Sequence, residues 1–338
     1  MVSKRYDAID ISKLFCAFLV TMIHANATGN TFSYFFVGAF SQQAVPFFFI
    51  VSGFFFSNKL IACKNANEAK RITLTYVKKN FMLYMVWQLV WAWYTLKDYL
   101  TIYSGESPAK IFLILLRRLF LAGNGVYWYV LVSAEAAVII YVLHRFKLKK
   151  FMYCLTVLGI VLSIIYNCFG QTDFLPFQLI YKSFYFVFSW SNNVIMMGLP
   201  YMAIGYAFAS GDLKIKSGTS AVLFVLSNIL NLVLYIVLAH YHVVNVSSYC
   251  LFYIIQAVSL FGLSYNSQIK IEKNILVRNM SNSIYFLHTI FIYWIMDPFM
   301  KFMPNPFLRA ALSIVLSMAV YALTAKTKFK PMKCLLSV

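Results

Sequence analysis

Long uninterrupted blocks of apolar residues constrain this chain more than any other feature of its sequence. Blocks of roughly 18 residues or more are long enough for a helix to cross about 30 Å of hydrocarbon. They show neither the alternation of strands nor the heptads of coiled coils. Charged residues make up only 12% of the chain, against about 25% in soluble domains. The sequence therefore predicts an all-α integral membrane protein with no separate soluble domain.

We predict about ten transmembrane helices in a single domain that covers residues 1–338. The block 110–121 is too short to cross and is interpreted as an interfacial or re-entrant piece. The aromatic-rich segment 173–192 contains Pro176 and is interpreted as an outer loop lying at the interface, where Tyr and Trp are favoured. The predicted spans are 9–27, 36–57, 80–97, 127–144, 151–168, 193–210, 219–240, 248–265, 281–299 and 306–325.

Lys and Arg residues fall unevenly on the two sides that these spans define. Of the 29 in the chain, 21 fall on one side and seven on the other, and Lys13 lies within the first span. Because basic loops are retained in the cytoplasm, the bias predicts that both termini are cytoplasmic and that the protein is a multi-pass component of the cell membrane, surrounded by lipid. The net charge of +19 sits in these short loops, so it does not indicate nucleic acid.

The first span carries three ionisable residues, which are costly in a membrane and so are candidates for function. Lys13 and His24 are eleven residues apart, which places them about 20° from alignment and about 16 Å apart along a helix. Asp10 lies one turn before Lys13 and can pair with it. A buried histidine with a lysine that snorkels to the headgroups is the plainer alternative. The shared face favours a functional site.

Further titratable groups lie in or beside later spans. Glu135 and His288 lie within spans, where a structural hydrogen bond and a role in a site both stay open. Asp297 is interpreted as a helix-end residue at the interface. His144 is expected to contact headgroups, and His240 to be solvated. No cluster of His, Cys and carboxylate residues has the spacing of metal ligands, so no metal is predicted.

Two basic stretches allow either lipid or substrate contacts. Arg117 and Arg118 lie on the side that is poor in positive charge, where they could bind an anionic substrate or, the slightly preferred interpretation, a lipid headgroup. The loop from Lys70 to Lys79 could hold phosphates. Such a loop is more often a topology signal and a headgroup contact.

Three segments resemble the acyltransferase-3 family of integral membrane acyltransferases, which also includes the membrane domains of vancomycin-resistance serine/alanine racemases. The opening RYDAIDISKLFCAFLVTMIHA is similar to the first helix of the family, with a basic residue, ten spacers and a histidine, here Lys13 and His24. VPFFFIVSGFFF resembles its aromatic stretch ending in Ser-Gly. SNSIYFLHT resembles a late helix with a tyrosine and a histidine, here Tyr285 and His288. Lys79 matches the second arginine of a family pair that enters the third helix.

The resemblance implies transfer of an acyl group, commonly acetyl, from cytoplasmic acyl-CoA to a hydroxyl of an extracytoplasmic acceptor such as a cell-surface glycan. Acetyl-CoA or another acyl-CoA would then be a co-substrate. His24 would act as general base or acyl relay, because a positioned histidine can take the proton of a hydroxyl nucleophile. Lys13, Lys78 and Lys79 would contact the donor. The supporting candidates are Asp10, Glu135, Tyr285 and His288.

A multi-pass transporter or flippase for a small polar solute or a lipid-linked glycan is the alternative function. Its intramembrane charges would form a pathway for substrate or protons. It predicts flux of a solute without acyl-CoA, whereas an acyltransferase requires the donor. An inactive scaffold would show neither activity nor binding of CoA.

Overall fold

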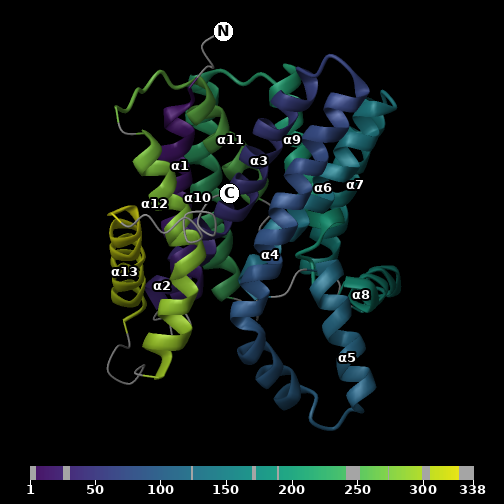
Figure 1. The fold of residues 1–338 in the computed structure, drawn as a ribbon, viewed down its shortest axis with the longest axis vertical. Coiled ribbons are helices and arrows are strands. Elements are labelled where there is room, and N and C mark those ends of the chain that lie inside the picture. Colours follow the sequence, from purple (N-terminus) through teal and green to yellow (C-terminus); the bar gives the residue numbers. More distant parts are fainter. Residues whose placement is uncertain are drawn as a thin grey trace. The chain divides into compact units, whose positions relative to one another are not determined.

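All regular elements that the structure describes are helical (Figure 1). The structure is a computed structural model. It describes residues 5–25, 31–122, 125–169, 173–188, 190–240, 252–272, 274–298 and 305–326. These divide into two compact units: unit 1 comprises residues 1–48 and 214–338, and unit 2 comprises residues 49–213.

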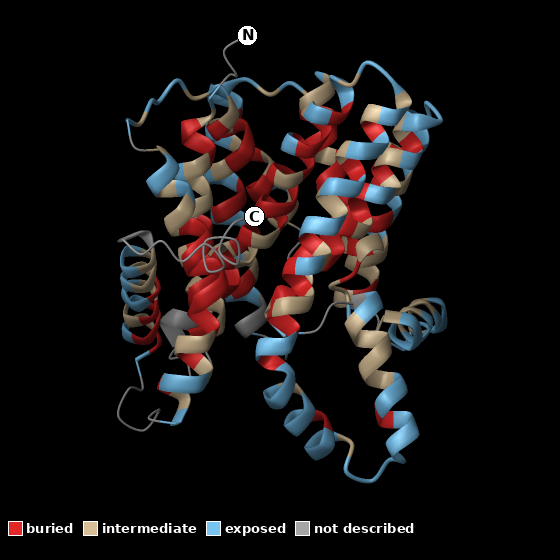
Figure 2. Ribbon diagram, viewed as in Figure 1, coloured by how far each residue is buried: buried red, intermediate tan, exposed pale blue. Residues whose placement is uncertain are grey.

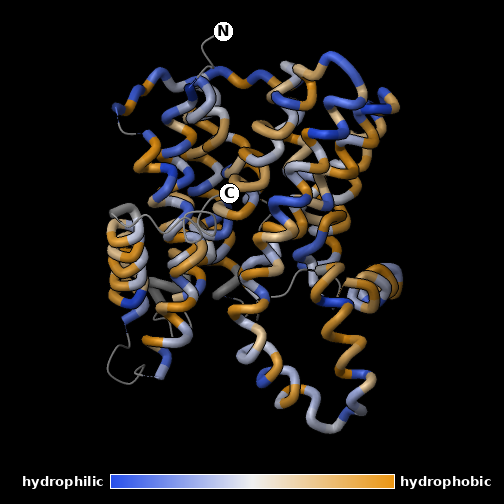
Figure 3. Tube along the Cα trace, in the orientation of Figure 1, coloured by the Kyte–Doolittle hydropathy of each residue, from blue (hydrophilic) through white to orange (hydrophobic). Residues whose placement is uncertain are grey.

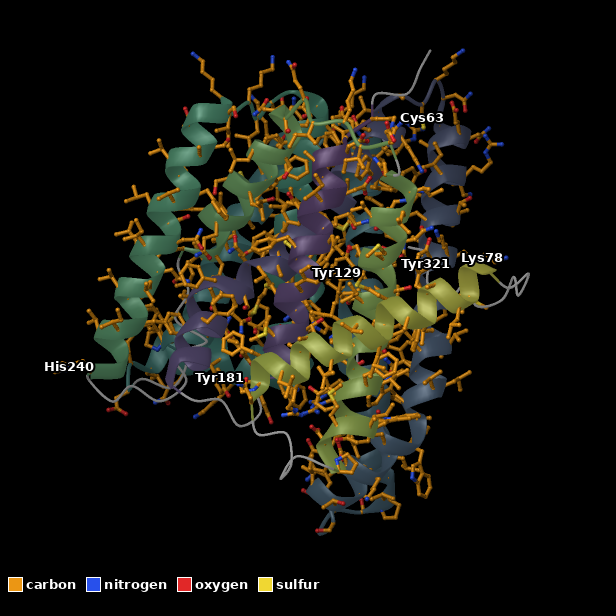
Figure 4. All side chains as sticks on the ribbon, turned by 90° about the vertical axis from the view of Figure 1, so that its left-hand side faces the viewer. Cys63, Lys78, Tyr129, Tyr181, His240 and Tyr321 are labelled. Carbon is orange, nitrogen blue, oxygen red and sulfur yellow. The ribbon has the colours of Figure 1, made fainter. Side chains whose placement is uncertain are left out.

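Unit 1 is a helical bundle in which α1 packs against α12, α13 and α11, and α10 packs against α11 and α2. The last helix, α13, crosses α12 obliquely (Figure 4). The helices of unit 1 are α1 (Asp7–Ala25), α2 (Thr31–Phe40), η1 (Ser41–Gln43), α10 (Ser217–His240), α11 (Tyr253–Asn266), α12 (Asn274–Thr289), η7 (Ile290–Met296) and α13 (Pro306–Lys326).

Unit 2 packs α4 and α9 against α6, and α7 against α9. The chain enters this unit within α3, and α4 extends beyond α6 before the chain returns as α5 (Figure 1). Its helices are α3 (Ala44–Ile61), α4 (Ala66–Ile102), α5 (Pro108–Arg117), η2 (Arg118–Ala122), η3 (Gly125–Tyr127), α6 (Trp128–Arg145), α7 (Lys149–Ile164), η4 (Ile165–Phe169), α8 (Leu175–Phe188), η5 (Val194–Gly198) and α9 (Leu199–Ser210).

Six helical stretches in the described residues are long and apolar enough to cross a membrane. The prediction of a helical membrane protein is therefore confirmed in its class. Each of the ten predicted spans overlaps a helix, although the span 248–265 begins outside the described residues. The six stretches are Asp7–Ala25, Phe36–Ile61, Pro108–Arg145, Lys149–Phe169, Ser217–Val237 and Pro306–Thr324.

The basic stretch from Lys70 to Lys79 is helical, so its prediction as a loop is wrong. It forms the first turns of α4, whose 37 residues correspond to about 55 Å at 1.5 Å per residue. Asn65 caps this helix by accepting a hydrogen bond from the Glu68 backbone N–H, and the Glu68 carboxylate accepts one from the Lys64 N–H. The first bond satisfies a backbone N–H of the first helical turn, and the second ties the preceding residue to that turn, so both favour a helix start here.

The segment 173–192 also differs from its prediction as a loop, because residues 175–188 form α8. Pro176 is the second residue of this helix, where the missing N–H has no helical partner to lose. None of the described α8 residues is buried (Figure 2). Figure 3 shows that most of its length is apolar. An apolar helix with no buried residue fits the predicted place at a membrane interface.

Close helix packing explains the glycine of the VSGFFF motif. A Cβ atom added to Gly53 in α3 would overlap the backbone of Met202 in α9, and one added to Gly205 would overlap the Ile50 carbonyl oxygen. Two glycines facing each other let the backbones approach closely, as small residues do in membrane helix pairs.

Candidate active site

His24 and His288 lie side by side in unit 1. Their ring centroids are 5.2 Å apart. His24 is presented by the last turn of α1, one residue before the end of the helix. His288 is presented by α12, which packs against α1 and is confirmed as the late helix of the SNSIYFLHT motif. The structure thus brings two of the predicted site residues together.

Tyr293 is the third member of this cluster and was missed in the sequence. Its hydroxyl lies 2.9 Å from Nδ1 of His24. Tyr293 follows His288 by five residues, and an α-helix would turn it about 140° away. The chain instead forms the π-helix η7 at Ile290–Met296. Bonding between residues five apart brings Tyr293 back toward the face of His288, and π-turns of this kind are frequent at functional sites.

The hydrogen bonding of His288 leaves one ring nitrogen unused. Nδ1 lies 2.8 Å from the backbone carbonyl oxygen of Ile284. A carbonyl oxygen only accepts, so Nδ1 carries the proton and the neutral ring has its lone pair on Nε2. Nε2 is buried and has no hydrogen-bond partner among the described residues. His288 therefore holds an available basic nitrogen beside His24.

A buried apolar cluster adjoins the site, because Tyr293, whose hydroxyl contacts His24, packs against it. Met22, Ala25 and Ile292 belong to a buried cluster that includes Val37 and Ala310. Tyr285, one turn before His288, is 8% exposed, and its ring centroid lies 6.4 Å from that of His288. Polar interactions are stronger in surroundings from which water is excluded.

At the opposite end of α1, Asp7 ties the helix to the start of α12. Its carboxylate accepts hydrogen bonds from the Ile271 N–H at 2.8 Å and from the Asn274 side chain. Asp10 and Lys13 lie one turn apart and interact electrostatically, with Arg278 of α12 as a further neighbour of Asp10. Since α1 is continuous from Asp7 to Ala25, the predicted spacing between Lys13 and His24 is preserved.

A buried ion pair at the His24 end of α1 was also missed in the sequence. Arg309 of α13 is fully buried, pairs with Asp297 and donates a hydrogen bond to the Ala25 carbonyl at 3.2 Å. Asp297 is therefore more than an interfacial helix end. The pair closes the last turn of α1, because the Ala25 carbonyl has no partner within the helix.

The other predicted site residues lie in unit 2. Glu135 on α6 has one carboxylate oxygen, Oε2, shielded from solvent without a partner among the described residues. Lys78 and Lys79 are exposed on α4. Lys78 borders a shallow hollow of about 420 Å³ that also includes Lys70, Arg71 and Thr75. This cationic face has the charge needed to bind phosphates.

The structure also describes two histidines outside the pair, His144 and His240. His144 lies 2.9 Å from the Tyr206 hydroxyl, so it joins α6 to α9 and the prediction of a mere headgroup contact is incomplete. His240 is exposed at the end of α10 (Figure 4), as predicted. Within the described ranges, no group of three or more His, Cys, Asp or Glu residues could hold a metal ion.

A comparison with protein families decides what kind of molecule this is. The sequence profile described as an acyltransferase domain of the acyltransferase-3 type matches residues 6–326. The chain belongs to the acyltransferase-3 family. The resemblance drawn from its motifs is thereby confirmed, and the match includes both histidines of the pair. The described residues therefore form a helical membrane domain of the acyltransferase-3 type.

One curated relative of this chain carries a different name. An amino-acid racemase of Enterococcus faecalis is 28% identical over 205 residues, which is 56% of this chain and 26% of that protein. The matched region thus spans about a quarter of the relative. It fits the expected kinship with racemase membrane domains. No solved structure matches the chain significantly.

Proposed function

We propose that this acyltransferase moves an acyl group, in the simplest case acetyl, from cytoplasmic acyl-CoA to a hydroxyl of an extracytoplasmic acceptor such as a cell-surface glycan. The observation that carries the proposal is the histidine pair of unit 1, with Tyr293 beside His24 and a free basic nitrogen on His288. A hydroxyl is a poor nucleophile. Acyl transfer to it therefore needs a positioned base that takes the hydroxyl proton.

The proposed reaction uses His24 as that base. Its Nδ1 donates to the Tyr293 hydroxyl, which leaves Nε2 free to take the proton of the acceptor hydroxyl. The hydroxyl oxygen attacks the thioester carbonyl carbon, a C–O bond forms, and the C–S bond breaks. The departing thiolate takes the proton back from the imidazolium, which yields the ester and free CoA thiol.

His288 supports this cycle in the proposal. Two imidazoles 5.2 Å apart would repel each other if both were charged in surroundings of low dielectric constant. The pair therefore holds one extra proton at most, and Nε2 of His288 can share it with His24. Tyr285 is proposed to shape the wall beside His288, and Glu135 and Asp10 remain supporting candidates.

The donor is proposed to bind through cations. Lys13 and the α4 residues Lys78 and Lys79 would contact the CoA part of the donor, as ammonium groups bind phosphates as point charges. The hollow on α4 adds Lys70 and Arg71 to this set. Acyl-CoA enters as a substrate, and no metal takes part in the proposed reaction.

The proposed topology has ten transmembrane helices, both termini in the cytoplasm and a location in the cytoplasmic membrane. The charge bias of 21 to seven Lys and Arg residues supports it. The face of α4 that carries Lys70 and Lys78 would then be cytoplasmic, where acyl-CoA is made.

Proteoliposomes containing the purified protein test the proposal. Labelled acetyl-CoA is supplied outside or inside the vesicles together with cell-surface glycan, and label in the glycan is measured. The proposal expects label transfer that requires acyl-CoA and the protein. Flux of a solute that needs no acyl-CoA, without label transfer, would instead identify a transporter.

A further inference from the structure

Arg117 and Arg118 form a pair of adjacent positive charges in unit 2, at the junction of α5 and η2. Both are only partly exposed. Neither makes an ion pair with a carboxylate among the described residues, where the nearby Glu106 pairs with Lys110 instead. Adjacent like charges that lack a counter-ion are unfavourable, and more so when partly removed from water.

The partners that these arginines do have are neutral. Arg117 donates from NH1 to the Phe186 carbonyl at 2.6 Å. The guanidinium carbon of Arg118 lies 5.2 Å from the centre of the Tyr99 ring and 5.4 Å from that of Trp190. These contacts fix the positions of both guanidinium groups without neutralising their charge.

Several donors at this place are unused. The Nε–H groups of Arg117 and Arg118 are shielded from solvent and have no partner within the described part of the chain. The Tyr99 side chain is 4% exposed, and its hydroxyl faces the Arg118 side chain. A guanidinium can only donate, so the hydroxyl proton still has no acceptor among the described residues. Buried donors normally find acceptors. Three unused donors beside two uncompensated charges therefore indicate a missing acceptor that is negatively charged.

We propose that Arg117, Arg118 and Tyr99 bind a phosphate or carboxylate oxyanion. The planar guanidinium groups suit its paired oxygens. The indole of Trp190 is 54% exposed and forms an apolar wall beside the site. The oxyanion is either free or the headgroup of a membrane lipid, since both present the same oxygens. This site is independent of the acyl-transfer proposal, because it uses none of the residues named there.

Binding of phosphate to the purified protein tests this site. The protein is held in a maltoside detergent without phosphate, and sodium phosphate is titrated against sodium chloride at equal ionic strength while the unfolding temperature is measured. We expect a saturable rise in the wild type. Arg118→Gln should weaken the apparent affinity at least tenfold, and Arg117→Gln should weaken it as well. Lys97→Gln, a change at an exposed lysine of α4 that belongs to none of the ion pairs of the described residues, should behave as the wild type.

A second measurement identifies the source of the oxyanion. Native mass spectrometry compares retention of phosphatidylglycerol with that of phosphatidylcholine by the same variants. Selective loss of phosphatidylglycerol in Arg118→Gln identifies a lipid headgroup, whereas binding of free phosphate alone identifies a soluble oxyanion. If Arg118→Gln does not fold, Arg118→Lys replaces it, which keeps the charge and should weaken binding through the lost planar geometry. Equal phosphate and lipid binding by the wild type and Arg118→Gln would overturn the proposal.

Discussion

The chemistry of the candidate active site depends on which nitrogen of each histidine carries a proton. The Ile284 carbonyl fixes the proton of His288 on Nδ1, and the Tyr293 hydroxyl contacts Nδ1 of His24. When Nδ1 of His24 donates to that hydroxyl, as in the proposed reaction, both rings offer Nε2 to a proton. Hydrogen bonds that hold one nitrogen are the usual way in which proteins set the role of the other.

A carboxylate outside the membrane spans gives a pH-dependent prediction. Asp212 accepts hydrogen bonds from Lys149 Nζ at 2.9 Å, the Tyr153 hydroxyl at 2.7 Å and the Ser210 hydroxyl at 2.6 Å. These donors, with that of Ser210 strongest, hold the pKa of Asp212 at about 2, below its ordinary value of 3.8. The stabilisation is therefore complete above pH 4 and disappears as the pH falls toward 2.

Asp212→Asn should therefore lower the unfolding temperature at pH 7. A decrease of about 1–3 °C is expected, because the group is partly exposed and its ion pair is screened. The difference from the wild type should shrink between pH 4 and pH 2. Asp98→Asn, on the exposed surface of α4, serves as the control and should have little effect. A deficit that does not change with pH would contradict this account.

Single site residues were predictable from the sequence where placing their side chains in a membrane helix is energetically costly. His24 and His288 stood out because ionisable groups in apolar helices are expensive. Tyr293 and Arg309 did not, since tyrosine is common near interfaces and Arg309 lies close to the start of the predicted span 306–325, where a basic residue needs no partner. Their roles depend on a π-turn and on packing between α13 and α1, which helical spacing does not reveal.

At the scale of elements, α4 is both a packing helix and a cationic surface. Its later residues Tyr84, Trp87 and Trp91 are buried, whereas its first turns expose Lys70, Arg71 and Lys78 around the hollow. A helix longer than the membrane is thick can carry such a face into water.

Removing a positive charge from this face of α4 should weaken the binding of acetyl-CoA, the proposed donor. Lys78→Ala is expected to raise KM for acetyl-CoA about tenfold, since a lost charge-assisted bond costs about 1.4 kcal/mol or more. Steady-state kinetics measure KM for acetyl-CoA and for acetyl-dephospho-CoA, which has one phosphate fewer. The rise in KM caused by Lys78→Ala should be smaller for acetyl-dephospho-CoA. Lys97→Ala, at the far end of α4, is the control. Equal KM values for Lys78→Ala and Lys97→Ala would remove α4 from donor binding.

The close approach of α3 and α9 gives a stability prediction. Gly53→Ala places a methyl group against the Met202 backbone, which cannot move aside as a side chain can. Overpacking of this kind should lower the free energy of unfolding by about 1–3 kcal/mol. Gly218→Ala is the matched control, since a Cβ there meets open space. Thermal unfolding in detergent compares the two, and equal stability would refute the packing argument.

The helical elements were more predictable than their ends. Hydrophobic length located the spans, because a membrane permits few other structures. The Asn65 cap of α4 and the proline near the start of α8 were local signals that charge and aromatic content masked. The Lys70–Lys79 stretch had the composition of a loop and the capping chemistry of a helix.

For the whole molecule, the family fixes the type of domain, and the apolar composition indicates that this domain lies in a membrane. The aligned stretch of residues 6–326 includes both units. The histidine pair lies entirely in unit 1, as do Lys13 and Asp10, whereas the cationic face of α4 lies in unit 2. Sequence alone could not assign residues to these units. The chain passes from one unit to the other within α3 and again after Leu213, and the sequence shows no obvious boundary at either place.

Transfer of labelled acetyl groups by histidine variants in proteoliposomes tests the central claim most directly. The account predicts that His24→Ala abolishes transfer, that His288→Gln reduces it strongly, and that His240→Ala, which changes an exposed histidine, leaves it intact. Each variant is first shown to be folded by its unfolding temperature. Wild-type rates of transfer by folded His24→Ala would contradict the account.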